Sequence, residues 1–324
     1  MANIAEVAKR AGVSAATVSR VSNGQRVNAE MEARVRVAMD ELKYTPSRTA
    51  RSLRRQTSEI IALVIPDIEN PYFTELARGV EDVASAAGFS VVLCNSDSLP
   101  AKEATYLGVA AAENMAGVIL APALRHTDLD ALDEAGIPVV CVDRSCDRPV
   151  DTVLMADRDA AREATETLIA AGFRRIACIT GPRGVETALE RTAGWRAAMA
   201  AHDLDVPASF LVRSNYRLDG GRLAMIQLLA EPDPPDAVAA MNNLMGMGAL
   251  QVLTERKLYP PAFGVAVVGN LPFTTYSPSG ITLASQPARD MGVTAARMLM
   301  ERIKGDDRPP RKVLLSCRLE PARA

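Results

Sequence analysis

AEVAKRAGVSAATVSRVSN, residues 5–23, contains two short apolar segments on either side of a glycine. Small apolar residues at helical spacing predict a first helix that ends at Gly12. Ser14 can cap a second helix over 15–21, because its hydroxyl can accept a hydrogen bond from an unpaired backbone N–H. Two short helices joined by a glycine-containing turn form a helix-turn-helix, whose second helix lies in the DNA major groove. An arbitrary amphipathic helix pair is the alternative.

A third helix is expected to hold the first two together, because two short helices cannot bury a core alone. Asn28 can cap it, and it is predicted to run from Ala29 to Leu42. Acidic residues in its first turn favour the helix dipole. Its apolar stripe is predicted to consist of Met31, Val35, Ala38 and Leu42.

Charge is distributed unevenly along the chain. Residues 1–58 contain eleven Lys or Arg and five Asp or Glu, a surplus of six positive charges. The whole chain has a net charge of −2, so the remainder has a surplus of eight negative charges. A basic N-terminal segment on an acidic body is typical of a nucleic-acid-binding module.

The segment AGVSAATVSRVSN (11–23) resembles the headpiece of the LacI/GalR, or lactose-repressor, family of bacterial transcription regulators. The resemblance continues along essentially the whole chain. It implies that Ala15, Ala16 and Arg20 occupy the base-reading positions. Alanine can contact a thymine methyl group but cannot hydrogen-bond, so part of the specificity is expected from Arg20 and from DNA shape.

Other short polar side chains nearby are suited to phosphates and base edges. The residues predicted to contact DNA are Ser14, Ala15, Ala16, Thr17, Ser19, Arg20, Asn23, Asn28, Arg48, Ala50 and Leu53.

Residues 46–58 are basic and polar, and the helix expected over 47–54 is too short to be stable alone. A basic linker is one interpretation. The family resemblance implies a hinge helix that orders on DNA, with Leu53 as an apolar wedge in the minor groove and Ala50 packed against a partner hinge. Two hinges packed together indicate a homodimer and a roughly palindromic operator.

From residue 59 onward, apolar runs without alternation are separated by helical stretches. This pattern predicts parallel sheets with helices on both faces. Eight strands in two sets of four suggest two lobes, and the resemblance implies a periplasmic-binding-protein-like core. The predicted strands are 60–66, 90–95, 116–122, 138–143, 174–181, 208–214, 237–242 and 265–270, with strand 281–285, helix 287–304 and strand 312–319 closing the fold.

The resulting domain organisation has three parts. The helix-turn-helix domain is predicted at 1–45, the hinge at 46–58 and an effector-binding and dimerisation domain at 59–324. The N-lobe is assigned to about 59–156 plus 271–300, and the C-lobe to about 157–270 plus 301–324.

Ligands in open α/β sheets bind beyond the carboxyl ends of the strands, so a two-lobe body is expected to bind between its lobes. The resemblance implies that Arg191, in the pattern R-x-A-G-W, contacts the effector and that Tyr216 stacks on it. For Asn70 and Asn270, the alternative to binding the effector is a role in forming the turn. For Trp195, the alternative is packing in the core. The predicted effector-binding residues are Asn70, Tyr72, Phe73, Asp143, Arg144, Arg191, Trp195, Tyr216, Asn243, Phe273 and Gln286.

The sequence departs from the family pattern twice. The usual Asn-Asp is Asn242-Asn243, and the usual Gly-Tyr/Phe-Asp is Gly269-Asn270-Leu271. Both changes remove negative charge while Arg191 remains. They put a plain neutral sugar in doubt and raise an anionic sugar derivative as an alternative.

Other function classes are less consistent with the sequence. A transport solute-binding protein needs a signal peptide, and MANIAEVAKR lacks one; no apolar run reaches the roughly 20 residues of a membrane span, so a cytoplasmic protein is expected. An enzyme is not indicated, because no nucleophile–base or carboxylate-pair motif is evident. No metal or cofactor is expected, and without a C-terminal heptad repeat a dimer is favoured over a tetramer. The five cysteines form no CxxC pair and are expected to be small hydrophobes, and the only histidines are His126 and His202.

Overall fold

The computed structural model describes residues 2–22, 25–44, 58–258, 262–271 and 280–322. The chain divides into two compact units, Met1–Ser58 and Glu59–Ala324. We call them the headpiece and the body. None of the helices in the described ranges is both long and apolar enough to cross a membrane.

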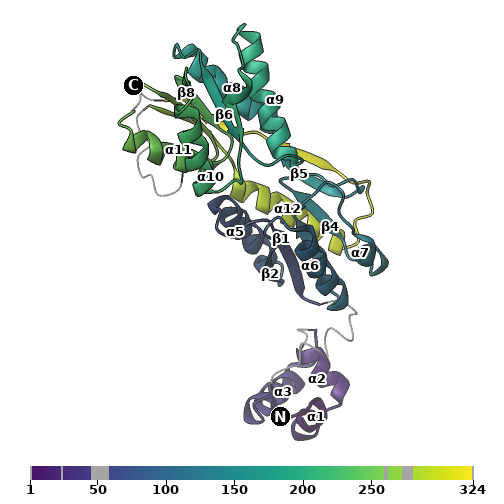
Figure 1. Ribbon diagram of the computed structural model, residues 1–324. Helices are drawn as coiled ribbons and strands as arrows, with labels where there is room; N and C mark the ends of the chain where they lie inside the picture. Colours follow the sequence, from purple (N-terminus) through teal and green to yellow (C-terminus); the bar gives the residue numbers. More distant parts are fainter. Residues whose placement is uncertain (1, 23–24, 45–57, 259–261, 272–279, 323–324) are drawn as a thin grey trace. The chain divides into compact units, whose positions relative to one another are not determined.

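The headpiece contains the three predicted helices, α1 (Ile4–Ala11), α2 (Ala15–Ser22) and α3 (Ala29–Glu41) (Figure 1). Gly12 ends α1 with a φ of +63°, a left-handed conformation that favours glycine. The Thr17 backbone N–H donates to Ser14 Oγ over 3.1 Å, which confirms the predicted cap of α2.

The start of α1 depends on a residue outside the 5–23 segment. Asn3 Oδ1 accepts hydrogen bonds from the backbone N–H groups of Ala5 and Glu6, both at 3.0 Å. The Glu6 carboxylate accepts in return from the Asn3 N–H at 3.1 Å. This reciprocal capping box satisfies unpaired donors at the helix start, so α1 begins at Ile4, just before the 5–23 segment.

The headpiece core is small and consists of short side chains. Met31 was wrongly placed in its apolar stripe: it is 40% exposed, because it lies on the outer face of α3. Leu42 lies just beyond the end of α3 and packs partly buried against the core. The buried core residues are Val7, Ala8, Ala11, Val18, Val21, Val35 and Ala38.

The body contains two six-stranded sheets. The first is parallel throughout and forms the N-lobe. Its strands in spatial order are β11 (Lys312–Leu315), β5 (Asp151–Met155), β4 (Val139–Val142), β3 (Gly117–Leu120), β1 (Ile60–Ile65) and β2 (Ser90–Asn95).

The second sheet forms the C-lobe and has one antiparallel edge strand, β12. Its strands in spatial order are β12 (Arg318–Glu320), β10 (Ile281–Ser285), β9 (Gly264–Val268), β8 (Ala237–Ala240), β6 (Ile176–Thr180) and β7 (Leu211–Arg213), the last preceded by the 3-10 helix η1 (Ala208–Phe210).

Helices cover both faces of each sheet, as the buried apolar strands predict (Figure 1). In the N-lobe, α5 (Pro71–Ala86) and α12 (Ala288–Ile303) pack on one face, and α6 (Pro100–Ala112) and α7 (Asp130–Glu134) on the other. In the C-lobe, α10 (Leu218–Leu229) and α11 (Asn243–Glu255) pack opposite α8 (Asp157–Ala170) and α9 (Glu186–Ala201).

Two C-terminal strands were assigned to the wrong lobe, whereas α12 and β12 lie in the lobes predicted for them. Strand β10 pairs with β9 in the C-lobe sheet, although 271–300 was assigned to the N-lobe. The predicted strand 312–319 is two strands: β11 joins the N-lobe sheet, and β12 joins the C-lobe sheet after two intervening residues. Strand β5 was not predicted. The chain therefore crosses between the lobes after β5, β10 and β11.

Close packing of α5 on α12 depends on glycine. A Cβ atom added to Gly292 would lie 2.1 Å from the Leu76 carbonyl oxygen, so the helix backbones touch. We expect Gly292→Ala to lower the free energy of unfolding by about 2–3 kcal/mol in urea denaturation, because neither backbone can yield. Gly108→Ala is the matched control: a Cβ there meets nothing within 4 Å, so it should stabilise α6 by about 0.5–1 kcal/mol. Equal effects of the two substitutions would contradict this packing.

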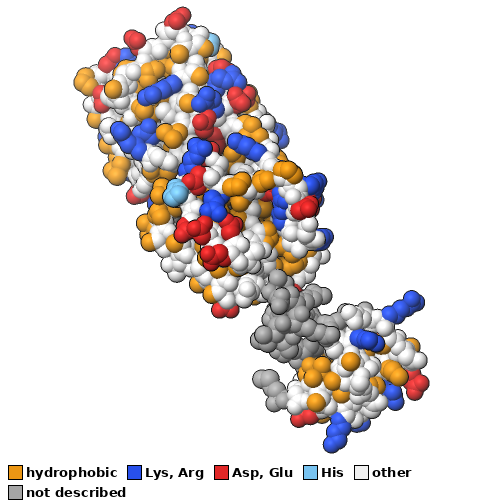
Figure 2. Space-filling view, turned by 90° about the vertical axis from the view of Figure 1, so that its right-hand side faces the viewer, with side chains coloured by type: hydrophobic (Ala, Val, Ile, Leu, Met, Phe, Trp, Pro, Cys, Tyr) orange, Lys and Arg blue, Asp and Glu red, His pale blue; other side chains and the backbone are white. Residues whose placement is uncertain are grey.

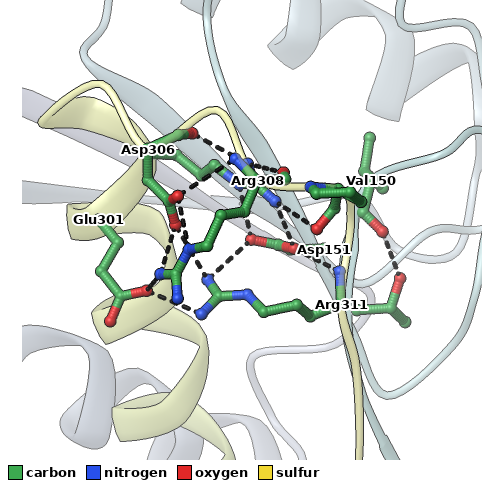
Figure 3. A network of polar contacts seen from close by, with 9 residues as sticks. Val150, Asp151, Glu301, Asp306, Arg308 and Arg311 are labelled. Atoms are coloured by element: carbon green, nitrogen blue, oxygen red, sulfur yellow. Dashed lines mark hydrogen bonds and ion pairs between the residues drawn. The ribbon is translucent and has the colours of Figure 1, made fainter.

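A buried carboxylate ties the N-lobe strands to α12 (Figure 3). The Asp151 side chain is fully buried and accepts from Arg302 Nε and Nη2, both at 2.9 Å, and from the Arg311 backbone N–H at 2.7 Å. Burial raises the pKa of Asp151, but the hydrogen bonds from these two arginines outweigh it and lower that pKa. Glu301 and Asp306 bind the outer side of the network through Arg308.

Candidate functional site

The exposed face of α2 carries the predicted base-reading residues. Ala15, Ala16 and Arg20 are exposed, whereas Val18 and Val21 of the same helix are buried in the headpiece core. In Figure 2 Lys and Arg side chains project from several sides of the visible headpiece face. A helix held by its apolar face leaves its other face free to enter a groove.

The remaining DNA-contact candidates fall into three groups. Ser14 is exposed and Thr17 half-buried, and their hydroxyl oxygens lie 3.0 Å apart. Ser19 is half-buried on α2, and Asn28 is exposed and caps α3, accepting from the Glu30 N–H at 2.9 Å. Four predicted residues lie outside the described ranges: Asn23, Arg48, Ala50 and Leu53.

A cavity of about 590 Å³ lies between the two lobes of the body. Its walls are the segments that follow the carboxyl ends of β1, β2, β3, β4, β6, β7, β8 and β10. Nine of the eleven predicted effector residues line it: Asn70, Tyr72, Phe73, Asp143, Arg144, Arg191, Tyr216, Asn243 and Gln286.

Arg191 is anchored at the base of this cavity. Its Nε donates to Asp157 Oδ1 and its Nη1 to the Met241 carbonyl oxygen, each at 2.7 Å. Burial raises the pKa of Asp157 to about 6 against the opposing effect of Arg191. Burial alone would lower the pKa of Arg191, but Asp157 and other neighbours raise it by more than burial lowers it. The guanidinium therefore stays charged. A buried cation with fixed orientation can bind ligand oxygens.

The aromatic wall formed by Tyr216 is held from two sides. The Tyr216 hydroxyl and Thr187 Oγ1 lie 3.0 Å apart. The ring also covers Gly181, where an added Cβ would lie 2.1 Å from Tyr216 Cζ. The backbone of Tyr216 has a φ of +62°. This fixed ring can stack on a flat or apolar ligand face.

Direct contacts join the lobes around the cavity. Asn243 Nδ2 donates to Asn70 Oδ1 at 3.0 Å. The Ser145 backbone N–H donates to Glu186 Oε2 at 2.6 Å, and its hydroxyl donates to the same carboxylate. The described structure therefore has its lobes in contact, through the starts of α9 and α11 in the C-lobe and through Asn70 and the loop after β4 in the N-lobe.

The two asparagines that were ascribed either to turns or to a ligand have structural roles. Asn70 caps α5 by accepting from the Tyr72 N–H at 3.0 Å. Asn270 holds Gln286 by accepting from its backbone N–H at 2.9 Å and donating to its carbonyl oxygen at 3.1 Å. Gln286 Nε2 is buried and has no hydrogen-bond partner among the described residues, so a ligand oxygen would satisfy it.

Two family profiles match this chain. The profile described as "Bacterial regulatory proteins, lacI family" matches residues 3–47. That described as "Periplasmic binding proteins and sugar binding domain of LacI family" matches residues 58–322. The chain belongs to the LacI family. It is therefore a DNA-binding transcriptional regulator, and the transport alternative is not favoured.

Similar proteins agree with this assignment. The ribose operon repressor of Halalkalibacterium halodurans is 36% identical over 307 residues, which cover 94% of this chain and 91% of that protein. The HTH-type transcriptional repressor PurR of Photobacterium profundum is 31% identical over 94% of this chain and 92% of that protein. Both relatives are regulators rather than enzymes.

Solved structures share the architecture. A complex of the transcriptional regulator CelR with cellobiose has a TM-score of 0.72 and 33% identity, and the match covers 99% of this chain and 98% of that one. The lac repressor dimer bound to operator and the anti-inducer ONPF has a TM-score of 0.85 with 24% identity, and covers 100% and 99% of the two chains. At that identity the second likeness supports the fold alone.

Two of the predicted effector residues are not among the described residues that line the cavity. Trp195 is fully buried in the C-lobe core, and its Nε1 donates to the Ile176 carbonyl oxygen at 3.2 Å. Its assignment as a ligand residue was wrong, because it lies one helical turn beyond Arg191 and faces the sheet. Phe273 lies outside the described residues.

The cavity of this LacI-family body also has walls that were absent from the predicted site. These lining residues follow the carboxyl ends of strands. The criterion that identified Asp143, a position just after a strand, could therefore also have identified them. No group of three or more His, Cys, Asp or Glu in the described part of the chain could hold a metal ion. The additional lining residues are Pro66, Asp67, Asp97, Ser98, Ala123, Leu124, Pro182, Arg183, Val185, Thr187, Asn215, Arg217, Asp219 and Asn242.

Proposed function

We propose that this LacI-family regulator represses transcription in the cytoplasm by binding operator DNA as a homodimer, and that a neutral sugar bound between the lobes controls it. The observation that carries the proposal is the interlobe cavity with Arg191 fixed at its base. A ligand that contacts both lobes changes their relative stability, and any resulting change in DNA affinity is reciprocal. The protein acts by binding and carries out no turnover.

The balance of charge in the cavity supports a neutral effector over an anionic one. Four carboxylates and four guanidinium groups line it. Asp157 already pairs with Arg191, and Asp143 lies 3.3 Å from Arg144 Nε. These pairs compensate for the acids that are absent at Asn243 and Leu271. Hydroxyl, amide and charged side chains line the cavity together with Tyr216, and such a lining suits a polyhydroxylated ring. The similar ribose repressor and the cellobiose complex suggest D-ribose and cellobiose as probes.

We expect Arg20→Ala to weaken specific binding about 10–100-fold, because a guanine-reading arginine contributes about 1–3 kcal/mol of discrimination. The operator is first selected from random duplexes with the full-length protein and then titrated at several salt concentrations. Binding to a scrambled duplex should change less, since it depends on the total phosphate contacts.

Arg36→Ala is the matched control, because Arg36 is exposed and paired with Glu32 on α3. Sequence-selective binding that Arg20→Ala leaves intact would contradict the assigned role of α2.

The same titration with D-ribose, cellobiose and ribose 5-phosphate tests the effector class. A response to the phosphate alone would favour the anionic alternative.

A further inference from the structure

Two cysteines lie close together beside the interlobe cavity. Cys141, on β4, is buried, and Cys146, in the loop that follows, is half-buried. Cys141 Sγ donates to Cys146 Sγ over 3.3 Å, and both thiols are reduced. The scattered spacing of the five cysteines indicated no such pair.

A tight turn produces this proximity. Asp143 has a φ of +65°, an uncommon conformation for a residue other than glycine. The Arg144 backbone N–H donates to the Val142 carbonyl oxygen at 2.6 Å. The chain reverses within these residues, so Cys146 returns to the side of Cys141. The turn in the backbone therefore places the two cysteines beside each other.

We propose that Cys141 and Cys146 are a reversible redox site, which closes to a disulfide and thereby alters the cavity. A disulfide bond is about 2.05 Å long, so the loop must move as the sulfur atoms approach. That loop carries Asp143 and Arg144, which line the cavity, and Ser145, which binds Glu186 of the other lobe. Oxidation therefore displaces cavity side chains and strains one contact between the lobes.

The electrostatics of the pair assign a role to each sulfur. The hydrogen bond from Cys141 lowers the pKa of Cys146 below the usual value for a thiol, which favours its thiolate form. The same hydrogen bond and burial raise the pKa of Cys141. Burial also raises the pKa of Cys94 and Cys317. Cys146 is the attacking sulfur, and Cys141 is the one that resolves the intermediate.

The reaction needs a hydroperoxide as its two-electron oxidant. The Cys146 thiolate attacks one peroxide oxygen, the O–O bond breaks, and the departing oxygen takes a proton to leave as an alcohol, or as water from hydrogen peroxide. Cys141 then loses its proton and attacks Cys146 Sγ, so the S–S bond forms and the S–O bond breaks. The released hydroxide takes that proton and leaves as water. A dithiol then reduces the disulfide to two thiols by thiol–disulfide exchange and is itself oxidised to a disulfide.

The test treats the reduced full-length protein with one equivalent of hydrogen peroxide. We expect the loss of two thiols and two hydrogens by intact mass, a peptide that links Cys141 to Cys146, and full reversal by dithiothreitol. Cys146 should react several-fold faster than Cys94 or Cys317. Hydrogen exchange should be faster at Ser145 in the oxidised protein, because its N–H separates from Glu186.

Three variants control the experiment, each checked for folding by circular dichroism. Cys317→Ser should behave like the wild type. Cys146→Ser should not show the rapid loss of thiols seen in the wild type. Cys141→Ser should accumulate a sulfenic acid that dimedone traps. Peroxide that produces sulfinic acid without the linked peptide would overturn the disulfide. A linked peptide together with unchanged hydrogen exchange at Ser145 would overturn the proposed effect of the disulfide on the cavity.

Discussion

Arg191→Ala is expected to weaken binding of the sugar effector about 100-fold and to leave operator binding insensitive to that sugar. The guanidinium is buried, charged and aimed by Asp157 and the Met241 carbonyl oxygen. A hydrogen bond from a charged group contributes about 1.5–3 kcal/mol, and Arg191 can make more than one. Isothermal titration with D-ribose and cellobiose measures the loss, and an operator titration with and without sugar measures the response.

Matched variants separate ligand binding from folding. Arg196→Ala removes an exposed arginine from the same helix and should leave sugar affinity unchanged. Arg191→Ala also leaves Asp157 buried without its cation, which destabilises the C-lobe. The double variant Arg191→Ala/Asp157→Asn removes that charge, so its stability should recover while sugar binding stays lost. Sugar affinity within about threefold of the wild type in the double variant would contradict the proposed contact.

Asp151→Asn is expected to lower the free energy of unfolding of the body by about 3 kcal/mol. The carboxylate is fully buried between Arg302 and Arg311, and breaking a buried pair costs about 3–5 kcal/mol because it leaves uncompensated charge. The expected loss of unfolding free energy lies at the lower end of that range because Arg311 is partly exposed and still binds Glu301. Urea denaturation followed by circular dichroism and by the fluorescence of Trp195 measures the change.

The effect of Asp151→Asn should depend on pH. The folded state lowers the pKa of Asp151, so its stabilisation is fully present above the unfolded pKa of about 4 and is lost as pH falls through the lower folded pKa. The difference between the wild type and the variant should therefore shrink in acid. Asp159→Asn removes an exposed acid on α8 and should cost less than about 1 kcal/mol at any pH. A similar loss for both variants would contradict the role of burial.

The network around Asp151 also bears on how the lobes are connected. It joins the start of β5 to the end of α12 and the start of β11, and each of these elements lies next to a crossing between the lobes. These contacts lie at the ends of the three elements that are farther from the crossings, so the network holds the elements together within the N-lobe.

Local signals were sufficient for the headpiece. Gly12 and Ser14 mark the turn, and the small apolar residues around them form the buried core that their spacing predicted. The misplacement of Met31 shows the limit, since an apolar side chain at a plausible helical position can still face solvent. Strand β5 was missed because its residues, DTVLM, begin with two polar side chains, which the fold buries between β4 and β11.

The cavity could be predicted in outline because position along the chain is enough to locate strand ends. Parallel strands of one sheet bring their carboxyl ends to one edge, so polar residues after those strands converge whatever the details of packing. Arg191 and Tyr216 were found in this way, together with the family pattern around them. Trp195 was misassigned because it follows Arg191 by one turn on the same face of α9, which places it beside the start of β6 and away from the strand ends.

The sequence by itself determined the helix-turn-helix, the alternation of strands and helices, and the ends of the strands where a ligand binds. These features depend on neighbours within a few residues of each other. Only the tertiary structure decided which sheet β10, β11 and β12 join, that Asp157 neutralises Arg191, and that a left-handed turn brings Cys146 to Cys141. Those outcomes depend on backbone pairing and packing between segments far apart in the chain, or on one backbone angle that residue type does not specify.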